Sequence, residues 1–171
     1  FFHIVYVVIL VKNFMTSNHS HQALVFGSIS IDKIINRYGT YDNVLGGSAS
    51  YALLATKSKE CQLVGMVGSD FPKNHFNLLG DHSINLNDLK IEEGKTFCWG
   101  GEYAHDFSSR ETLYVDPGVS EKYQPILSAS SKQCQYLLLG NTHPKLQLEV
   151  LNQIESNPFI ILDTFKLYMD I

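Results

Sequence analysis

Cysteines, basic clusters and long apolar runs are all scarce in this sequence, and each scarcity excludes a class of protein. The 171 residues include three cysteines, Cys61, Cys98 and Cys134, and no C-x-x-C spacing. A disulfide framework or a zinc site is therefore not expected, and this usage is typical of a reducing compartment. The formal net charge is −4 and no basic patch is present, so we expect no nucleic-acid partner.

The N-terminal segment holds the longest apolar run, but that run is short. Residues 1–11 are apolar except for His3, whereas a membrane helix needs about 20 apolar residues, so we expect no membrane partner. The basic start of a signal peptide is also absent, and the sequence does not begin with Met. The first methionine is Met15. We therefore interpret residues 1–22 as a tail in which residues 1–14 are a non-native extension, with a truncated signal or anchor segment as the alternative.

What is present is the composition of a globular protein. Hydrophobic residues make up 44% of the sequence and charged residues 18%, which argues against broad disorder. Short apolar runs alternate with helical patterns along the chain, and this order predicts a parallel α/β sheet. We expect strands at residues 24–27, 62–67, 136–139 and 159–162, and helices at residues 48–57, 70–80 and 144–154.

Two regions depart from this alternation. Residues 28–38 favour an extended segment that leaves the sheet edge, and the polar and glycine residues that follow indicate a loop up to position 47. Residues 95–103 and 111–115 are rich in aromatic and β-branched side chains, which predicts an inserted β-hairpin. Asp70 is expected to cap the helix that follows it.

The common catalytic and metal-binding motifs are missing. The stretch Gly94-Lys95-Thr96 resembles the end of a phosphate-binding P-loop, but that motif needs a glycine where this sequence has Leu89. Neither the dinucleotide fingerprint G-x-G-x-x-G nor the zinc motif H-E-x-x-H occurs, and the seven histidines show no ligand spacing. We therefore predict no metal site.

Small and polar residues gather instead where the predicted strands end. Asp32 follows the first strand, Gly46 and Gly47 precede the first helix, and Asn141 and Asp163 follow the third and fourth strands. Ligands of open α/β sheets bind at the carboxyl ends of strands, so these residues predict a crevice for a polyol, with N–H groups of the helix start exposed to it. The alternative is that the two aspartates are turn residues, the glycines form a tight turn and Asn141 is a helix cap.

Six stretches of the sequence, in this order and spacing, resemble the opening of carbohydrate kinases of the ribokinase (PfkB) family. They are residues 25–32, 46–52, 63–72, 94–97, 139–144 and 163–164, with Arg110 and Thr112 between them. The resemblance covers residues 23–168 and only the N-terminal half of the family's domain. It implies an α/β, ribokinase-like fold (a Rossmann-like three-layer sandwich) over residues 23–171, C-terminally truncated, with a small β lid formed near residues 29–40 and 95–115.

The resemblance also implies an enzyme, a carbohydrate kinase that uses ATP and Mg²⁺ to phosphorylate a hydroxyl of a sugar or nucleoside. The substrate-binding residues that it implies are Asp32, Gly46, Gly47, Ser50 and Asn141, with Asp163 near the substrate or the phosphates. Ser50 stands where family members often carry Asn, which leaves the identity of the sugar open. The family's catalytic Gly-Ala-Gly-Asp motif does not occur in the sequence, so no catalytic residue is assigned and we expect the fragment alone to be inactive.

The family resemblance further implies a cytoplasmic protein that can form a homodimer through the β lid, with most of the ATP and Mg²⁺ contacts made by the missing half. A second hypothesis, from another class, is a non-catalytic sugar-binding or dimerisation module. A dinucleotide-binding domain is a weaker third hypothesis, since its glycine fingerprint is absent.

Overall fold

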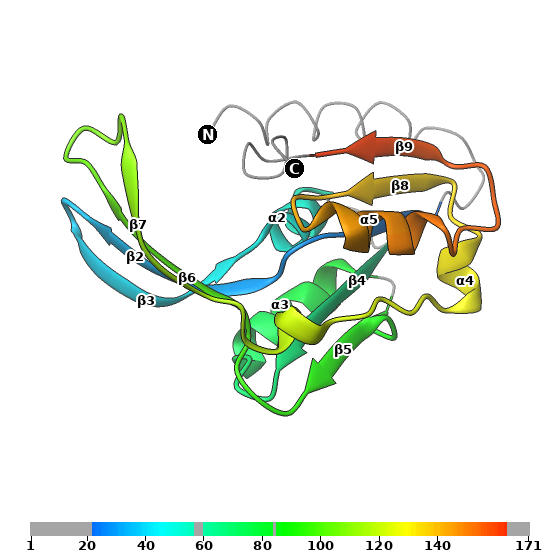
Figure 1. Ribbon diagram of the computed structural model, residues 1–171, viewed down its shortest axis with the longest axis horizontal. Helices are drawn as coiled ribbons and strands as arrows, with labels where there is room; N and C mark the ends of the chain where they lie inside the picture. Colours follow the sequence, from blue (N-terminus) through cyan, green and yellow to red (C-terminus); the bar gives the residue numbers. More distant parts are fainter. Residues whose placement is uncertain (1–21, 57–59, 84, 164–171) are drawn as a thin grey trace.

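Two β-sheets of different character organise the chain. The computed structural model describes residues 22–56, 60–83 and 85–163, so the predicted tail, apart from Gln22, and the predicted start at Met15 lie outside the described residues. Figure 1 shows a central sheet flanked by helices and a second sheet that extends from one end of it. In the described part of the chain, no helix is long and apolar enough to cross a membrane.

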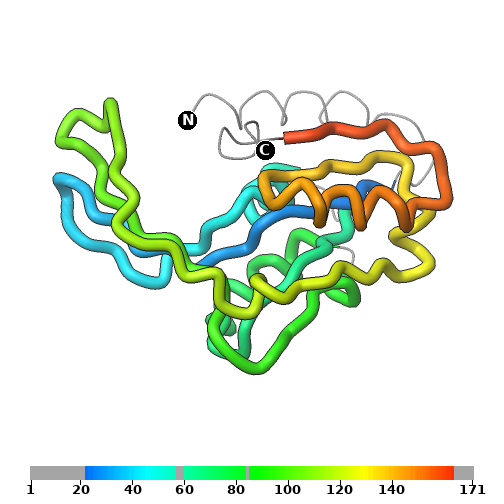
Figure 2. Tube along the Cα trace, viewed as in Figure 1, coloured from blue at the N-terminus to red at the C-terminus, as the bar shows by residue number. Residues whose placement is uncertain are grey.

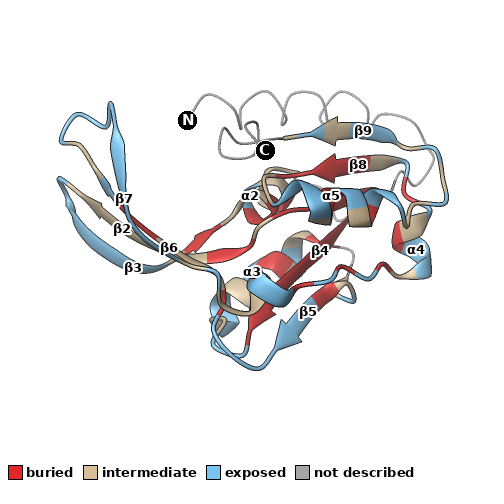
Figure 3. Cartoon of the chain, in the orientation of Figure 1, coloured by how far each residue is buried: buried red, intermediate tan, exposed pale blue. Residues whose placement is uncertain are grey.

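The central sheet contains five parallel strands in the order β5-β4-β1-β8-β9. The strands are β1 (Ala23–Phe26), β4 (Cys61–Gly68), β5 (Leu89–Glu92), β8 (Tyr136–Leu139) and β9 (Phe159–Leu162). Every residue of β1 and β4 is buried, whereas β9 at the sheet edge is mostly exposed (Figure 3). Burial on both faces explains the nearly continuous apolar sequences of the two inner strands.

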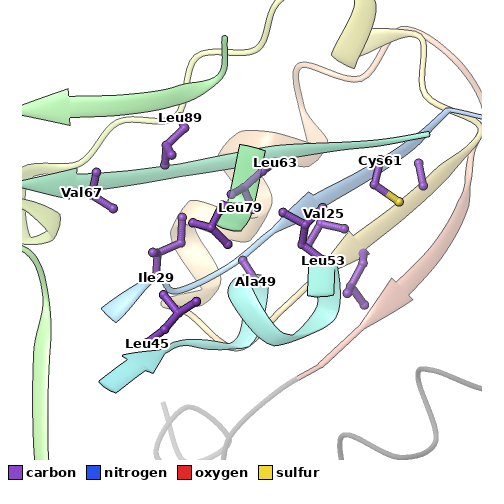
Figure 4. Packing of buried hydrophobic residues seen from close by; sticks show 12 residues of the cluster. Val25, Ile29, Leu45, Ala49, Leu53, Cys61, Leu63, Val67, Leu79 and Leu89 are labelled. Carbon is purple, nitrogen blue, oxygen red and sulfur yellow. The ribbon is translucent and has the colours of Figure 1, made fainter. Parts of the chain in front are cut away.

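Alternate side chains of the central strands point into two separate hydrophobic cores. The helices are α2 (Ser48–Ala55), α3 (Lys73–His82), α4 (Ala129–Lys132), α5 (Pro144–Leu151) and the 3₁₀ helix η1 (Gly118–Lys122). On one face, Val25 and Leu63 pack with Leu53 of α2 and with α3 (Figure 4). On the other face, Phe26 packs in a core that includes Val150 of α5. The domain therefore has three layers: helices, sheet and helices.

We call the second sheet the lid. Its strands are β2 (Ser30–Asn36), β3 (Gly39–Gly46), β6 (Cys98–Tyr103) and β7 (Arg110–Asp116), in the order β3-β2-β6-β7. The pairs β2–β3 and β6–β7 are antiparallel hairpins, and a parallel pairing of β2 with β6 joins them. Figure 2 shows these two segments, which are far apart in the sequence, running side by side away from the central sheet.

The structure confirms the predicted parallel α/β sheet, its four predicted strands and the hairpin of β6 and β7. It corrects the prediction at β3, which was expected to be a loop, and adds β5, which was not expected. Five of the eight residues of β3 are exposed, and β5 buries only Leu89. These strands lie at sheet edges or face solvent, so their sequences lack the apolar pattern of a covered strand.

The prediction that Asp70 caps α3 is wrong, because Pro72 occupies the N-cap position. The Oδ1 atom of Asp70 instead accepts hydrogen bonds from the N–H and the hydroxyl of Thr96, both at 2.7 Å. The Thr96 hydroxyl oxygen also accepts from the N–H of Gly68 at 2.9 Å. This arrangement ties the end of β4 to the segment that leads into the lid.

Candidate functional site

Asp32 and Gly46 lie against each other where the lid meets the central sheet. The pairing of β2 with β3 places Ser30 opposite Gly46, and a Cβ atom at position 46 would overlap both Asp32 Oδ2 and Ser30 Oγ. The missing side chain of Gly46 therefore provides the space that the Asp32 carboxylate occupies. The register of the lid strands thus brings two of the predicted site residues together.

The Asp32 side chain is partly buried, and its Oδ1 atom is fully buried. Burial raises the pKa of Asp32 above its ordinary value, and this effect outweighs the opposing hydrogen bonds from the Ser30 side chain and the Trp99 backbone and the nearby charge of Arg110. Among the described residues, nothing donates a hydrogen bond to the buried Oδ1 atom of Asp32. A buried carboxylate oxygen without a donor is costly. A ligand hydroxyl that donated to this oxygen would therefore be stabilised.

Gly47 forms the turn from the lid into α2. Its φ angle is 94°, a left-handed conformation that favours glycine, and a Cβ atom there would overlap the carbonyl oxygen of Ser28. The prediction of exposed N–H groups at the helix start is wrong for Ser48, whose N–H donates to Ser28 Oγ at 3.0 Å. The next N–H, of Ala49, donates to Ser28 O at 3.0 Å. The start of α2 is therefore fastened to the end of β1.

Asn141 and Asp163 lie at the carboxyl ends of β8 and β9. The hydroxyl of Ser48 donates to Asn141 O at 3.2 Å, which places the residue after β8 beside the start of α2. The N–H of Asp163 continues the hydrogen bonding between β9 and β8. The buried side chain of Gln147 donates to the carbonyl oxygens of Gly140 and Asp163, each at 3.0 Å, and so links the two strand ends.

Ser50 and its neighbour Tyr51 lie in contrasting environments. Ser50 is fully buried and its hydroxyl has no hydrogen-bond partner among the described residues. Tyr51 is 44% exposed, and its hydroxyl donates to Leu45 O at 2.9 Å. Burial, followed by the charges of Asp32 and Tyr103, raises the pKa of Tyr51. Tyr51 is therefore the exposed side chain of α2 that lies near the Asp32 carboxylate, and sequence reasoning did not assign it to the site.

The lid contributes further side chains that sequence reasoning did not assign. Trp99 and Tyr103 lie on alternate positions of β6 and therefore on one face of the lid. Arg110 is the direct partner of Tyr103 across the β6–β7 pair, and its charge acts on Asp32. The alternating aromatic residues of β6 indicate a shared face, but only the pairing of β6 with β2 shows that this face lies beside Asp32.

The described residues provide no fitting site for Mg²⁺ or for the phosphates of a nucleotide. They include no group of three His, Cys, Asp or Glu side chains that could hold a metal ion. The hydroxyl of Thr96, in the stretch that resembles a P-loop, is already bonded to Asp70 and Gly68. A hollow of about 440 Å³ beside η1 is lined by both lysines and glutamates and contains none of the predicted site residues. We therefore assign ATP and Mg²⁺ to no residue of this chain.

Comparison with known proteins identifies the fold. No protein-family model matches the chain, and no curated protein does. Among solved structures, ribokinase from Cryptococcus neoformans var. grubii serotype A in complex with ADP has a TM-score of 0.67 at 19% identity, over 83% of this chain and 50% of that chain. The nucleoside kinase of Methanocaldococcus jannaschii, an archaeal member of the ribokinase family, has a TM-score of 0.61 at 18% identity, over 84% and 52%.

A third structure, the Burkholderia thailandensis nucleoside kinase in complex with inosine, has a TM-score of 0.63 at 14% identity and covers 82% of this chain and 52% of that chain. These likenesses confirm the predicted ribokinase-like α/β fold and the predicted resemblance to half of such a domain. The chain spans about half the length of the solved structures that it matches.

Proposed function

We propose that the full-length form of this protein is a carbohydrate kinase that transfers a phosphoryl group from ATP to a hydroxyl of a sugar or nucleoside. The fold supports this proposal, because structures that share it include a ribokinase with ADP and a nucleoside kinase with inosine. The observation that carries it is the Asp32 carboxylate, which is buried at the junction of lid and sheet with one oxygen that lacks a donor. Such an oxygen is suited to a substrate hydroxyl.

In this proposal each residue of the site binds or orients the substrate. Asp32 accepts a hydrogen bond from a substrate hydroxyl, Gly46 leaves the space that the Asp32 carboxylate occupies, and Gly47 allows the turn that leads into α2. Ser50 lies beneath the site in α2, with a hydroxyl that has no hydrogen-bond partner among the described residues, and Asn141 contacts the substrate from the end of β8. The lid covers the bound substrate and excludes water, which would otherwise compete for the phosphoryl group.

In this proposal the reacting hydroxyl of the substrate lies near Asp163, at the end of β9. ATP supplies the phosphoryl group with Mg²⁺, and no residue of this chain is assigned the role of base, since the sequence contains no Gly-Ala-Gly-Asp motif. Phosphoryl transfer depends on such positioning and charge stabilisation. We therefore propose that the 171-residue chain binds substrate without turning over ATP.

Calorimetric titration of the chain with D-ribose, D-fructose, adenosine and inosine tests the binding role. We expect at least one of these compounds to bind, and Asp32→Asn to weaken that binding by about tenfold, the loss typical of a charge-assisted hydrogen bond. Asp42→Asn is the matched control, because Asp42 lies on the same hairpin but is exposed and paired with Lys33 at 3.1 Å. Absence of binding to all four compounds, or equal losses in both variants, would refute the proposal.

We also propose that the protein is cytoplasmic and forms a homodimer through the lid. The three cysteines are free, as expected for a reducing compartment. The lid exposes several large apolar side chains, among them Tyr38 (67%), Leu113 (45%) and Val115 (55%), and patches of this kind mark interaction surfaces. Sedimentation analysis tests the dimer: Leu113→Lys should shift it to monomer, and a wild-type chain that stays monomeric at high concentration would rule it out.

A further inference from the structure

Arg110, Trp99 and Gly101 lie together on the lid, in a cluster that we call the Trp99 stack. A Cβ atom at position 101 would overlap the Trp99 ring, so the indole lies directly against Gly101. The guanidinium carbon of Arg110 lies 5.2 Å from the centre of that ring on a cation–π contact. The indole is itself fixed by a 3.1 Å hydrogen bond from its Nε1 to the hydroxyl oxygen of Thr112. Arg110 is exposed, and its positive charge lies beside the Trp99 ring.

The face of the lid that carries this stack is the face near Asp32. Gly101 pairs with Thr112, and Tyr103 pairs with Arg110, so the four side-chain positions share one face with Trp99. Lys33 is the partner of Gly100 across the β2–β6 pair, which places the preceding residues of the two strands, Asp32 and Trp99, next to each other.

Among the described residues, Arg110 has no ion-pair partner. The described residues form ion pairs at Lys33, Lys90 and Lys132, and Arg110 takes part in none of them. Its nearest acidic neighbours along the paired strands are Glu102 and Glu111, which pair with each other on the opposite face of the lid. The site beside Asp32 therefore combines a carboxylate oxygen that lacks a hydrogen-bond donor with an exposed cation that forms no ion pair among the described residues.

We propose that the substrate of this site carries an oxyanion, a carboxylate or a phosphate group, that binds Arg110 while a hydroxyl of the same molecule binds Asp32. This inference rests on the proposed sugar- or nucleoside-binding function and narrows its substrates to acidic polyols. A guanidinium held by a cation–π contact keeps N–H groups available, and these can bind an oxyanion in a bidentate fashion. Its charge also offsets the repulsion between Asp32 and an anionic ligand.

Calorimetric titrations of the 171-residue chain with matched pairs of compounds test the inference. D-gluconate carries a carboxylate where D-glucitol carries a hydroxymethyl group, and D-ribose 5-phosphate differs from D-ribose by its phosphate. We expect the anionic member of at least one pair to bind about tenfold more tightly than its neutral partner. The pair that shows this advantage tells whether the oxyanion is a carboxylate or a phosphate. The advantage should shrink as salt is added, since salt screens exposed charges.

Two pairs of variants test whether the tighter binding of the anion depends on the Trp99 stack. Arg110→Gln should abolish the preference for the anion, whereas Lys33→Gln, which removes a lid cation already paired with Asp42, should preserve it. Gly101→Ala should reduce the preference by displacing the Trp99 ring. Gly100→Ala should preserve it, because a Cβ atom there would overlap the Tyr114 ring on the other face.

Three outcomes would overturn the inference: equal affinities within both pairs, no binding of either anion, or equal effects of Arg110→Gln and Lys33→Gln. Equal affinities for anion and neutral partner would leave the proposed kinase function standing, because the polyol would still bind. A preference for the anion, together with no phosphoryl transfer in a full-length form, would refute the kinase function and leave the assignment of Arg110 intact.

Discussion

Gly46 and the carboxylate of Asp32 share one space at the base of the lid, since a Cβ atom at position 46 would overlap Asp32 Oδ2. Gly46→Ala should therefore push the carboxylate aside and weaken substrate binding by about tenfold, a loss comparable to that of a charge-assisted hydrogen bond. The backbone at Gly46 is not left-handed, so the melting temperature should change little. Calorimetry with the compound that binds wild type checks this.

Gly80→Ala is the control for this substitution. Gly80 lies within α3, and the nearest atom to an added Cβ would be Leu86 Cδ1 at 3.6 Å, an ordinary contact. Replacing glycine by alanine inside a helix stabilises by about 0.5–1 kcal/mol, so this variant should melt slightly higher and bind substrate as wild type does. Unchanged binding in Gly46→Ala would show that the carboxylate position does not matter.

Gly47→Ala should act on stability, in contrast to Gly46→Ala. The φ angle of 94° is strained for alanine, and the added Cβ would overlap the Ser28 carbonyl, which cannot rotate away as a side chain can. We expect a loss of about 1–3 kcal/mol in the free energy of unfolding. Urea denaturation followed by circular dichroism measures it. An unfolding midpoint equal to that of wild type would show that the turn into α2 relaxes without cost.

The parts of the fold that the sequence predicts are those where one physical requirement dominates. β1 and β4 are covered on both faces, so their residues are almost all apolar and the strands are visible in the sequence. β3 and β5 carry no such constraint, since most of their residues face solvent. Whether these segments form strands depends on the neighbouring strands with which they pair, and the sequence of one segment does not carry that information.

The same contrast holds within the candidate site. Asp32 and Gly46 are predictable because ligands of α/β sheets bind at strand ends, where small and acidic residues are informative. The roles of Tyr51 and Arg110 depend on contacts between α2, β2 and β7 that are distant in sequence. At Asp70 a local rule leads to a wrong prediction. The rule predicts a helix cap, but the Asp70 carboxylate is hydrogen-bonded to Thr96, which is distant in the sequence.

The raised pKa of Asp32 should make its contribution to stability depend on pH. Its ordinary value is 3.8, and burial raises it in the folded chain. The folded state therefore holds the Asp32 proton more tightly than the unfolded state does. The contribution of Asp32 to stability is present below its ordinary pKa and is lost as the pH rises through its pKa in the folded chain. The melting temperature of Asp32→Asn minus that of wild type should increase between about pH 3.5 and about pH 7.

Asp106→Asn provides a control of opposite sign. Hydrogen bonds from the Ser108 side chain and backbone lower the pKa of the exposed Asp106. Its small contribution to stability is therefore present above the ordinary pKa of an aspartate and is lost as the pH falls. The melting temperature of Asp106→Asn minus that of wild type should therefore decrease as the pH rises. Parallel pH profiles for the two variants would show that burial of Asp32 does not control its titration.

Thr96→Val should destabilise the link between the central sheet and the lid. Valine has nearly the same shape but lacks the hydroxyl that accepts from the Gly68 N–H and donates to Asp70. A buried N–H without an acceptor costs about 1–3 kcal/mol, and thermal or urea unfolding measures the loss. Thr40→Val is the matched control on the exposed strand β3 and should unfold as wild type does. Equal stabilities of all three proteins would count against this link.

Cys98 should be the one cysteine that reacts rapidly with a thiol reagent in the folded chain. Cys61 and Cys134 are buried, and burial raises the pKa of both, that of Cys134 to about 11; the thiolate is the reactive form. Cys98 is partly exposed on the lid, where its thiol contacts the Tyr114 hydroxyl at 3.7 Å. Titration with a disulfide reagent should show one fast thiol, which Cys98→Ser removes, and three thiols after denaturation. A fast phase that survives in Cys98→Ser would mean that one of the two cores opens readily.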